Sequence, residues 1–330
     1  MKAWVLSDGA AGNARQAMAL AEALARTVPE TSGPGLSCEV RHLKLRWPAT
    51  WWAPRLGTLA DVRDRDGAML QPPWPEIAIG CGRVAALATR CLRSRGVRVA
   101  QILDPRIDAR SFDALIVPAH DAVAGANVVV TLGSLHGIDD RWLAHARQQF
   151  AGLHEHPSPR TAVLVGGPVR RLPWTRRDLD RMIVILRHWL GRDGGSLMFS
   201  TSRRTPVWAQ RKLREAFADS AALFHTPADR DDNPYPGLLA HADRIVVTGD
   251  SVNMISEACA VGVPVLCHAP GAASGRLGAF HRALLQSGHI RPLRLEYTPV
   301  RVEPLREMDA VVARTAQLLG LNPGPSVTDS

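Results

Sequence analysis

An alternation of short apolar strands with amphipathic helices constrains this chain more than any other feature of its sequence. Each apolar run ends in a loop rich in Gly, Ser, Asp or Arg, and a stretch with helical spacing of apolar residues follows. Strands separated by helices favour parallel sheets with right-handed crossovers, so the sequence predicts an α/β fold. The expected strands are Ala3–Leu6, Cys38–Leu43, Glu76–Ile79, Val97–Leu103, Ala114–Val117, Asn127–Leu132, Thr161–Val165, Ser196–Ser200, Ala221–Phe224, Arg244–Val247 and Pro264–Cys267.

The alternation breaks in "GLHEHPSPR" (Gly152–Arg160) and then restarts. Prolines among polar residues indicate a linker, and a chain of 330 residues suits two domains. We therefore expect two Rossmann-like domains, residues 1–155 and 156–330, that face a cleft and bind ligands there at the carboxyl ends of their strands. The His-Glu-His triple at residues 154–156 lacks further ligands at useful spacing, so we interpret it as a solvated hinge and expect no metal.

Three helices carry start or stop signals. Asn13 with Gln16 forms a capping-box pattern ahead of an apolar stripe, and Thr175 with Asp178 repeats that pattern. We expect the second helix to end at Gly191 and a final helix over Leu305–Leu319. The expected buried stripes are Ala17, Leu20, Ala21 and Leu24 in the first helix, and Leu179, Met182, Ile183, Leu186 and Leu190 in the second.

The charge balance favours anionic partners. Lys and Arg together number 40 against 31 acidic residues, a formal net charge of +9, which suits phosphates, anionic lipid or nucleic acid; the alternative is dispersed, solvated surface arginine. Because no aromatic platform alternates with the arginines, we expect no nucleic-acid partner. Five cysteines without a C-x-x-C pair, a start that is not a signal peptide and the lack of a spanning apolar run predict a cytoplasmic protein, at most peripheral at the inner membrane.

Two loops that follow expected strands have anion-binding features. "VGGPVRR" offers Gly166 and Gly167 for close backbone approach and two arginines for an anion; a tight turn with surface arginines is the alternative. "FSTSRRTPVW" places Arg203 and Arg204 beside Pro206, which we expect at the first position of a helix with free N–H groups. Because three anion-attracting features coincide in the second loop, we favour a diphosphate site over a capped helix with solvated arginines.

A third loop, "TGDSVNMISEACAVGVPV", begins at Thr248. Asp250 or Ser251 is expected to cap the helix Val252–Ala260, and Glu257 lies two turns from that cap on the same face. A carboxylate at the carboxyl edge of a parallel sheet is a good acceptor for neighbouring sugar hydroxyls. The alternative, a surface position for Glu257, is weakened by its apolar neighbours.

These residues resemble known families. "LLAHADRIVVTGDSVNMISEACAVGVPVL" resembles the donor-nucleotide signature of type-B glycosyltransferases. More closely, "SDGAAGNARQ", "IGCGR", "PAHD" followed by "NVVVTLGSLH", "STSRRTP" and "TGDSVNMISEA" are similar to the mitochondrial fission factor ("elongated mitochondria") family and its bacterial relatives. The stretches spread from residue 7 to 258, so the resemblance covers most of the chain.

The resemblance implies a GT-B-like fold with an N-terminal acceptor-side domain and a C-terminal domain for a nucleotide sugar. Glu257 would bind the ribose, and the Ser251 helix start and the Ser202–Thr205 loop would bind phosphates. One departure is that Ser251 stands where the transferase loop usually has glycine; Asp250 beside it either caps the helix or addresses a sugar hydroxyl or base. The residues expected at the nucleotide sugar are Gly166, Gly167, Ser202, Arg203, Arg204, Thr205, Asp250, Ser251, Asn253 and Glu257.

The implied function is transfer of a nucleotide-activated sugar to a cell-envelope or lipid-type acceptor, with the nucleotide-diphosphate sugar as substrate and neither cofactor nor metal. Asp121 or His120, just past an expected strand, is the first choice for the base that takes the acceptor proton, and Asp8 is the second. Gly9, Gly12 and Asn13 would lie on the acceptor side. The alternatives are a non-catalytic scaffold protein and a nucleotide-sugar epimerase.

Two further motifs have competing interpretations. Gly80-x-Gly82-x-x-Ala85 with Asp104 passes as a dinucleotide fingerprint, but it follows the third expected strand rather than the first. "LRWPATWWAPRL" combines three tryptophans with flanking arginines, which suits a membrane surface or a lipid-linked acceptor. From the sequence alone we favour ordinary aromatic packing for this second motif.

Overall fold

The computed structural model describes residues 1–27, 35–220, 222–229, 233–269 and 273–321. They form two compact units, one of Met1–Gly137 with Glu307–Ser330 and the other of Ile138–Arg306. The division therefore falls at 137/138 and not at the expected 155/156, and the last helix returns to the first unit. The expected linker, Gly152–Arg160, overlaps the 3₁₀ helix Ala151–Glu155 inside the second unit. The helix before it, Asp140–Gln149, packs against the helix Tyr235–His241 of the same unit.

The first unit is built on a mainly parallel sheet. In its described part the strand order is β3-β2-β1-β4-β5-β6-β7, with β3 antiparallel to β2. The predicted strands are present, and the short β3 was not predicted. The elements are β1 Lys2–Ser7, α1 Ala11–Thr27, β2 Ser37–Leu45, β3 Val62–Asp64, β4 Ile77–Cys81, α2 Arg83–Arg93, β5 Arg98–Ile102, β6 Ala114–Pro118, β7 Val128–Thr131 and α9 Met308–Leu318.

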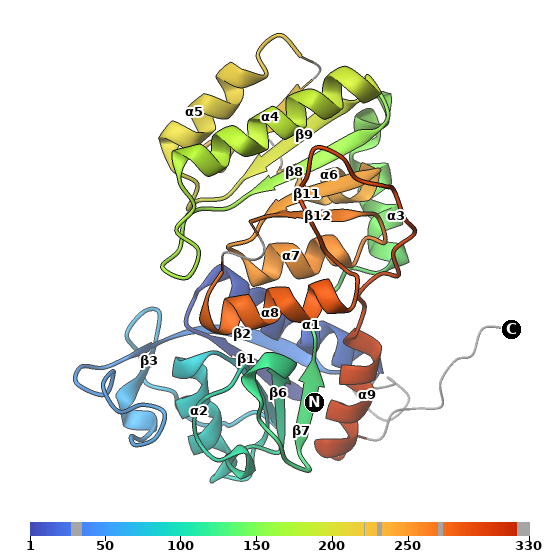
Figure 1. The fold of residues 1–330 in the computed structure, drawn as a ribbon. Coiled ribbons are helices and arrows are strands. Elements are labelled where there is room, and N and C mark those ends of the chain that lie inside the picture. The colour runs from blue at the N-terminus through green and yellow to red at the C-terminus, as the bar shows by residue number, and fades with distance from the viewer. Residues whose placement is uncertain (28–34, 221, 230–232, 270–272, 322–330) are drawn as a thin grey trace, which may run out of the picture. The chain divides into compact units, whose positions relative to one another are not determined.

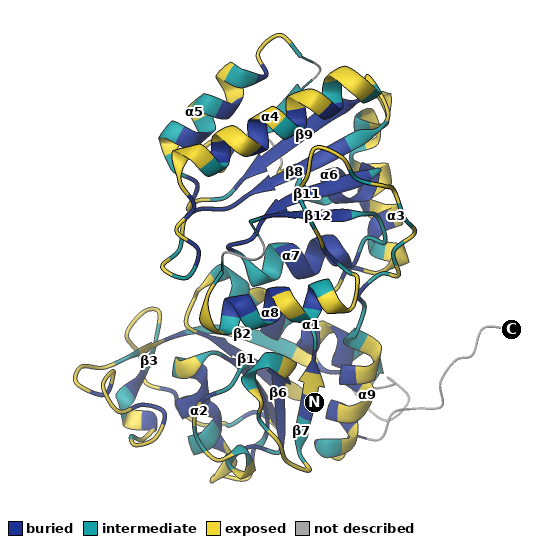
Figure 2. Ribbon diagram, viewed as in Figure 1, coloured by how far each residue is buried: buried dark blue, intermediate teal, exposed yellow. Residues whose placement is uncertain are grey.

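Alternate residues of β1 enter two different cores. Ala3 and Val5 pack with α1 and α9, whereas Trp4 and Leu6 pack with α2, because successive side chains of a strand point to opposite faces. Strands β1, β4 and β6 are almost entirely buried, whereas β2 is mostly half-buried (Figure 2). The centre of the sheet is thus covered on both faces, as parallel strands require.

The second unit repeats this plan. In its described part the order is β10-β9-β8-β11-β12-β13 and the pairs are parallel. The two-residue strand β13 was not predicted. The elements are α3 Asp140–Gln149, β8 Arg160–Val165, α4 Arg176–Asp193, β9 Ser196–Thr201, α5 Val207–Ala216, β10 Ala222–His225, α6 Tyr235–His241, β11 Arg244–Thr248, α7 Val252–Cys259, β12 Val265–His268, α8 Gly275–Gln286 and β13 Arg291–Pro292.

Both sheets reverse their direction of growth beside their first strand. In the second unit, β9 and β10 add on one side of β8 and β11 to β13 on the other. Right-handed crossovers then place α4 and α5 on one face and α6 and α7 on the other; Figure 1 shows α4 and α5 together beside β9. The order reverses between β8 and β11, and ligands of such folds bind at the carboxyl ends of the strands beside this reversal. The equivalent reversal in the first unit lies between β1 and β4.

Several predicted helix signals were right and others were wrong. The Thr175–Asp178 capping box is present, but α4 continues past Gly191 and ends at Gly194, whose positive φ of 66° suits a C-cap glycine. Trp189 takes the buried position expected of Leu190. The expected stripe of α1 is buried.

The start of α1 and the extent of α9 differ from prediction. α1 begins at Ala11, so Asn13 is inside the helix and forms no capping box with Gln16. Asn13 instead donates to Asp8, and Gln16 accepts from the backbone of Leu135. α9 is shorter than the predicted Leu305–Leu319.

Candidate functional site

Three loops of the second unit meet at the carboxyl ends of β9, β8 and β11, which are neighbours in the sheet. The carbonyl oxygen of Val165, at the end of β8, accepts from the backbone N–H of Ser202 at 2.9 Å and from the hydroxyl of Thr205 at 2.8 Å. The next backbone N–H, of Gly166, donates to the Thr248 hydroxyl at 2.7 Å. The structure therefore brings together the three loops that the sequence singled out.

Asp250 forms hydrogen bonds with residues of all three loops. Its Oδ2 accepts from the backbone N–H of Gly167 at 3.0 Å and from Arg204 Nη2 at 2.8 Å, and its Oδ1 accepts from the Thr248 hydroxyl at 2.7 Å. The side chain is inaccessible to solvent. Burial raises the pKa of the Asp250 carboxyl, although its hydrogen bonds and Arg204 act in the opposite direction. Asp250 thus links all three loops, and in this geometry it positions Arg204.

Gly166 and Gly167 are required by contacts within the protein. A Cβ at Gly166 would lie 2.5 Å from Asp250 Cγ, and a Cβ at Gly167 would lie 2.6 Å from the backbone carbon of Arg204. Side chains at either position would push the loops apart. The prediction was that these glycines let a ligand approach closely; in the structure they let neighbouring loops approach each other.

The loop after β9 divides into inward and outward residues. Thr205 is buried and its hydroxyl accepts from the Ser202 backbone, so it holds the turn. Arg203 and Arg204 are exposed. Pro206 is the N-cap of α5 and not the expected first helical residue, and no side chain caps that helix. The outward face of this loop therefore carries two guanidinium groups next to a helix N-terminus, an arrangement that favours anions.

The start of α7 settles which residue caps it. Ser251 is the N-cap and its hydroxyl accepts from the backbone N–H of Met254 at 3.4 Å, so Asp250 is not the cap. Asn253 is half-buried in the first turn.

Glu257 is held toward the carboxyl edge of the sheet. Glu257 is 8% exposed, and its Oε2 accepts a hydrogen bond from the Tyr235 hydroxyl at 2.5 Å. Tyr235 is the first residue of α6, which follows the carboxyl end of β10, so the contact lies on the ligand side of the sheet. A carboxylate can accept up to about four hydrogen bonds, and the Tyr235 hydroxyl supplies one of those to Glu257.

In the first unit, the loops after β1 and β4 meet at the reversal point. Asp8 accepts from the backbone N–H of Ala10 at 3.0 Å and from Asn13 Nδ2 at 3.1 Å. Gly82, with φ of 87°, is the N-cap of α2, and a Cβ there would lie 2.6 Å from Asn13 Nδ2. Gly9 also has positive φ, at 78°, and Gly12 lies inside α1. Gly82 of the "IGCGR" motif therefore allows the loop after β4 to approach Asn13, whereas Gly80 lies within β4 and allows close packing against Thr89 of α2 and Gln101 of β5.

The candidate bases do not form one cluster. His120 and Asp121 lie in a 3₁₀ turn after β6, with His120 Nε2 3.9 Å from Asp121 Oδ1 and with side chains 10% and 4% exposed. Asp8 follows β1, three strands away in the sheet order. At about 4.8 Å between strands, that separation is about 14 Å. Asp8 is thus an alternative to the His120–Asp121 pair and not its partner.

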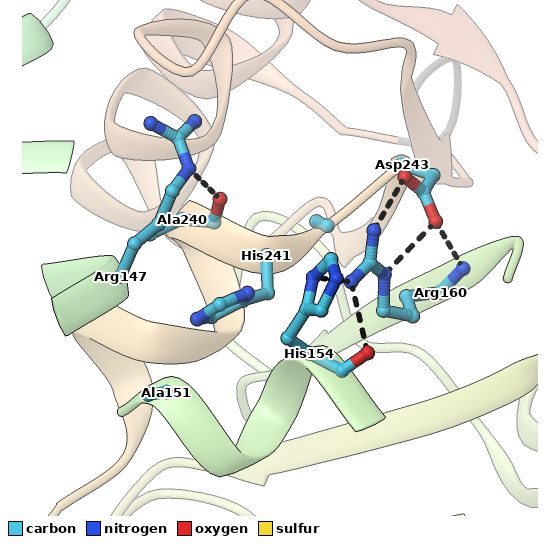
Figure 3. A pocket seen from close by; sticks show the side chains of 8 residues that line it. Arg147, Ala151, His154, Arg160, Ala240, His241 and Asp243 are labelled. Carbon is cyan, nitrogen blue, oxygen red and sulfur yellow. Dashed lines mark hydrogen bonds and ion pairs between the residues drawn. The ribbon is translucent and has the colours of Figure 1, made fainter. Parts of the chain in front are cut away.

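A pocket of about 590 Å³ lies at the amino ends of β8 and β11, opposite the three-loop junction (Figure 3). Arg160, at the start of β8, forms an ion pair with Asp243 at 3.2 Å and contacts His154 Nδ1 at 3.0 Å, while Arg147 donates to the Ala240 carbonyl at 2.9 Å. Burial lowers the pKa of His241 beside them. These polar groups are engaged with one another and attach residues 138–157 to the sheet.

Sequence reasoning missed Tyr235 and Thr248. Tyr235 lies 22 positions before Glu257 and has no local signal. Thr248 ends the apolar strand β11, and its type gives no sign of a special role. Its buried hydroxyl accepts from the backbone N–H of Gly166 and donates to Asp250. Parallel strands whose ends meet a charged loop are a signal that could have drawn attention to Thr248.

The protein has two mainly parallel sheets, and polar, glycine-containing loops follow the carboxyl ends of the first strands in each. This arrangement defines an α/β protein of the GT-B fold class, as predicted. Residues 11–319 match the family described as Mitochondrial fission ELM1, and the chain belongs to that family. No group of three His, Cys, Asp or Glu side chains arranged to hold a metal ion, and no helix suited to crossing a bilayer, occurs among the residues that the structure describes.

Two curated relatives support the family assignment. The chain is 30% identical over 251 residues to "Mitochondrial fission protein ELM1" of Arabidopsis thaliana, a match that covers 66% of this chain and 57% of the relative. It is 24% identical over 306 residues to "Uncharacterized protein RP120" of Rickettsia prowazekii (strain Madrid E), covering 82% of this chain and 84% of the relative. The chain thus spans little more than half the length of the plant relative.

Solved structures with a similar fold include two UDP-GlcNAc 2-epimerases. The enzyme from Methanocaldococcus jannaschii has a TM-score of 0.53 at 11% identity, and the match covers 98% of this chain and 93% of that one. The enzyme from Neisseria meningitidis, solved with UDP-GlcNAc bound, has a TM-score of 0.50 at 11% identity, covering 96% of this chain and all of the other. At such identity these likenesses show the fold alone.

Proposed function

We propose that the protein binds a nucleotide-activated sugar at the carboxyl edge of its second unit and transfers the sugar to a cell-envelope or lipid-type acceptor. The observation that carries the proposal is the junction of three loops around buried Asp250, which holds Arg204 at the reversal point of the sheet. This is the place where doubly wound sheets bind nucleotides.

The diphosphate would lie against Arg203 and Arg204. The Arg204 side chain is 48% exposed although one of its nitrogens is paired with Asp250. A guanidinium has five N–H donors in a fixed fork, so Arg204 can donate to phosphate oxygens while it keeps this pair. The starts of α5 and α7 add backbone N–H groups and a favourable dipole.

Glu257 would accept hydrogen bonds from the pentose hydroxyls. It lies six residues beyond the Ser251 cap, which at 1.5 Å per residue is about 9 Å along the helix. That spacing suits a nucleotide whose phosphates lie at the helix start and whose ribose lies further along. The Tyr235 hydroxyl donates to Glu257 Oε2 and so holds the carboxylate in place.

In an inverting transfer, a base removes the proton of the acceptor hydroxyl as its oxygen attacks the anomeric carbon. The His120–Asp121 pair is the proposed base because a carboxylate beside an imidazole can orient it and stabilise its charged form. Asp8 is the alternative. The departing nucleoside diphosphate would be stabilised by Arg203 and Arg204, so the reaction needs positive charge at the leaving group rather than a redox cofactor.

Calorimetric titration with UDP, CDP and their sugar conjugates tests the donor site. We expect Glu257→Ala to weaken binding at least tenfold, because it removes hydrogen bonds to a charged acceptor worth about 1.5–3 kcal/mol each. Glu215→Ala, an exposed glutamate on α5, is the matched control and should leave affinity unchanged. Equal affinity of Glu257→Ala and the parent protein would refute the assignment.

Product analysis separates the proposed transfer from the alternatives. Incubation with the donor that binds, with and without a lipid-linked sugar acceptor, should release nucleoside diphosphate only when the acceptor is present. Conversion of the donor to an isomer without acceptor would show an epimerase. Binding without turnover in either mixture would show that the fold serves a scaffold.

A further inference from the structure

The segment Arg46–Gly57, between β2 and β3, inverts the usual pattern of burial; we call it the tryptophan loop. Trp47, Trp51 and Leu56 are 77%, 79% and 66% exposed, and Trp52 is 41% exposed, whereas Ala49 and Ala53 are 1% and 3% exposed. Figure 2 draws this stretch beside β3 with much of its surface exposed. The favoured interpretation, ordinary aromatic packing at a loop, is therefore wrong for Trp47 and Trp51.

The backbone of the tryptophan loop is fixed by hydrogen bonds. Arg83 of α2 donates to the carbonyl oxygens of Ala53 and Thr50 at 2.5 and 2.7 Å. Arg90 of the same helix donates to those of Arg55 and Gly57 at 2.9 and 2.7 Å. Ala53 belongs to the core that α2 forms with the sheet. The loop thus has a buried, anchored side, and the indoles are held on the other side.

An anchored loop that presents large apolar side chains marks an interaction site, because soluble proteins rarely expose such groups together. Indole rings combine an apolar body with one N–H donor and are enriched at the level of lipid headgroups. A binding surface for one compact apolar ligand would need a concavity, but the exposed indoles project from a turn.

The charge around the tryptophan loop selects the kind of surface. From residue 40 to residue 60 the sequence contains no carboxylate, and Arg46 and Arg55 are exposed at the two ends of the loop. Each basic residue near an anionic bilayer adds about 1 kcal/mol of attraction. Aromatic insertion and basic flanks are the two complementary signals that stable, reversible membrane attachment requires.

We propose that the tryptophan loop docks the protein on a bilayer that contains anionic lipid, with Trp47, Trp51 and Leu56 inserted among the headgroups and Arg46 and Arg55 against the lipid phosphates. The tryptophan loop belongs to the first unit alone, so this peripheral membrane surface does not depend on the proposed donor site.

Vesicle sedimentation of the full chain, without nucleotide, tests the proposal. The protein should bind vesicles of phosphatidylcholine mixed with phosphatidylglycerol, and Trp47→Ser/Trp51→Ser should lower the partition coefficient at least tenfold. Val184→Ser/Val207→Ser, which changes two apolar residues that are 58% and 69% exposed in the second unit, is the matched control and should bind like the parent. Since all four side chains are largely exposed, unchanged circular dichroism and melting temperature are expected for both variants.

Two further measurements define the mode of binding. Acyl chains brominated near the headgroup should quench the tryptophan fluorescence of the parent protein more than that of Trp47→Ser/Trp51→Ser. Arg46→Ala/Arg55→Ala should reduce binding to the anionic vesicles and leave any residual binding to phosphatidylcholine alone unchanged.

Three outcomes would overturn the proposal. The first is that the parent protein does not bind anionic vesicles. The second is that the double tryptophan variant binds them as tightly as the parent does. The third is a dimer of the parent in light scattering that the tryptophan changes convert to a monomer, because the loop would then cover a second copy of this chain.

Discussion

Gly166→Ala is the most direct test of the three-loop junction. The added methyl carbon would lie 2.5 Å from Asp250 Cγ, well inside normal contact. Asp250 is a short side chain without solvent exposure, and it is bonded to Gly167, Thr248 and Arg204. It can make room only by giving up those partners or by pushing the β8 loop away from the β11 loop.

The expected loss of stability follows from these two routes. Overpacking a fitted interior by one methyl group costs about 1–3 kcal/mol. A buried carboxylate that loses hydrogen bonds loses about 1.5–3 kcal/mol for each one. A mixture of the two routes gives about 3–5 kcal/mol. For a unit of this size, 1 kcal/mol shifts the melting temperature by about 2–4 °C, so Gly166→Ala should melt about 10 °C lower or more.

The same substitution at Gly191 serves as the matched control. Gly191 is exposed inside α4, and a Cβ there would meet no heavy atom within 4 Å. Alanine replaces glycine in a helix interior with a gain of about 0.5–1 kcal/mol, so Gly191→Ala should raise the melting temperature by about 2–3 °C. Differential scanning calorimetry of both variants gives the comparison. A Gly166→Ala protein that melts within a degree of the parent would refute the described packing. A Gly191→Ala protein that is less stable than the parent would show that α4 ends at Gly191, as the sequence predicted.

Two other consequences concern carboxylates that hold loops. Burial raises the pKa of the Asp250 carboxyl, so the stability that its neutral form contributes is present below the ordinary value of 3.8 and is lost as pH rises through the folded-state pKa. Urea titrations should therefore show the parent protein losing stability relative to Asp250→Asn as pH increases. A stability difference that stays constant with pH would contradict this direction. Glu307 accepts from the backbone N–H groups of Leu132 and Gly133 at 2.8 and 3.0 Å, so Glu307→Gln should lower the free energy of unfolding by about 1–2 kcal/mol and speed hydrogen exchange at those amides, whereas Glu22→Gln on the exposed face of α1 should do neither.

The central strands of both sheets were predictable because they are buried on both faces. In such strands nearly every position is apolar, as in Arg244–Thr248 with its Ile-Val-Val core, and the run stands out in the sequence. β3 and β13 escaped prediction because they are two or three residues long and carry no apolar run. Their assignment depends on pairing with a neighbour, which local sequence does not encode.

Domain boundaries and helix ends were harder for a related reason. The Pro-rich stretch after residue 156 is a loop signal, yet the chain has already entered the second unit at residue 138. The contacts that decide this, such as Arg147 to the Ala240 carbonyl, join residues 93 positions apart. In the same way, Gly191 and Gly194 are both C-cap candidates because both are glycine, and only the positive φ of Gly194 distinguishes them.

The candidate site shows the same division between residue type and residue role. Residue type and spacing identified the three loops, because an apolar strand followed by Gly, Arg or Asp can be recognised in the sequence alone. They did not reveal that Thr205 and Thr248 turn inward and that Tyr235 contacts Glu257. Those roles depend on which loops are neighbours, and the strand order β9-β8-β11 decides that.

The sequence left open whether a carboxylate at position 250 competes with phosphate. The structure gives Asp250 no exposed surface and three hydrogen-bond donors, so a ligand cannot reach it without dismantling the junction. Its negative charge is balanced by Arg204, whose guanidinium remains about half exposed. An arginine held at one end by a buried carboxylate loses little further side-chain entropy when it binds an anion at the other end. If the proposed function is correct, the carboxylate would orient the Arg204 guanidinium toward a phosphate and would not occupy the phosphate's place.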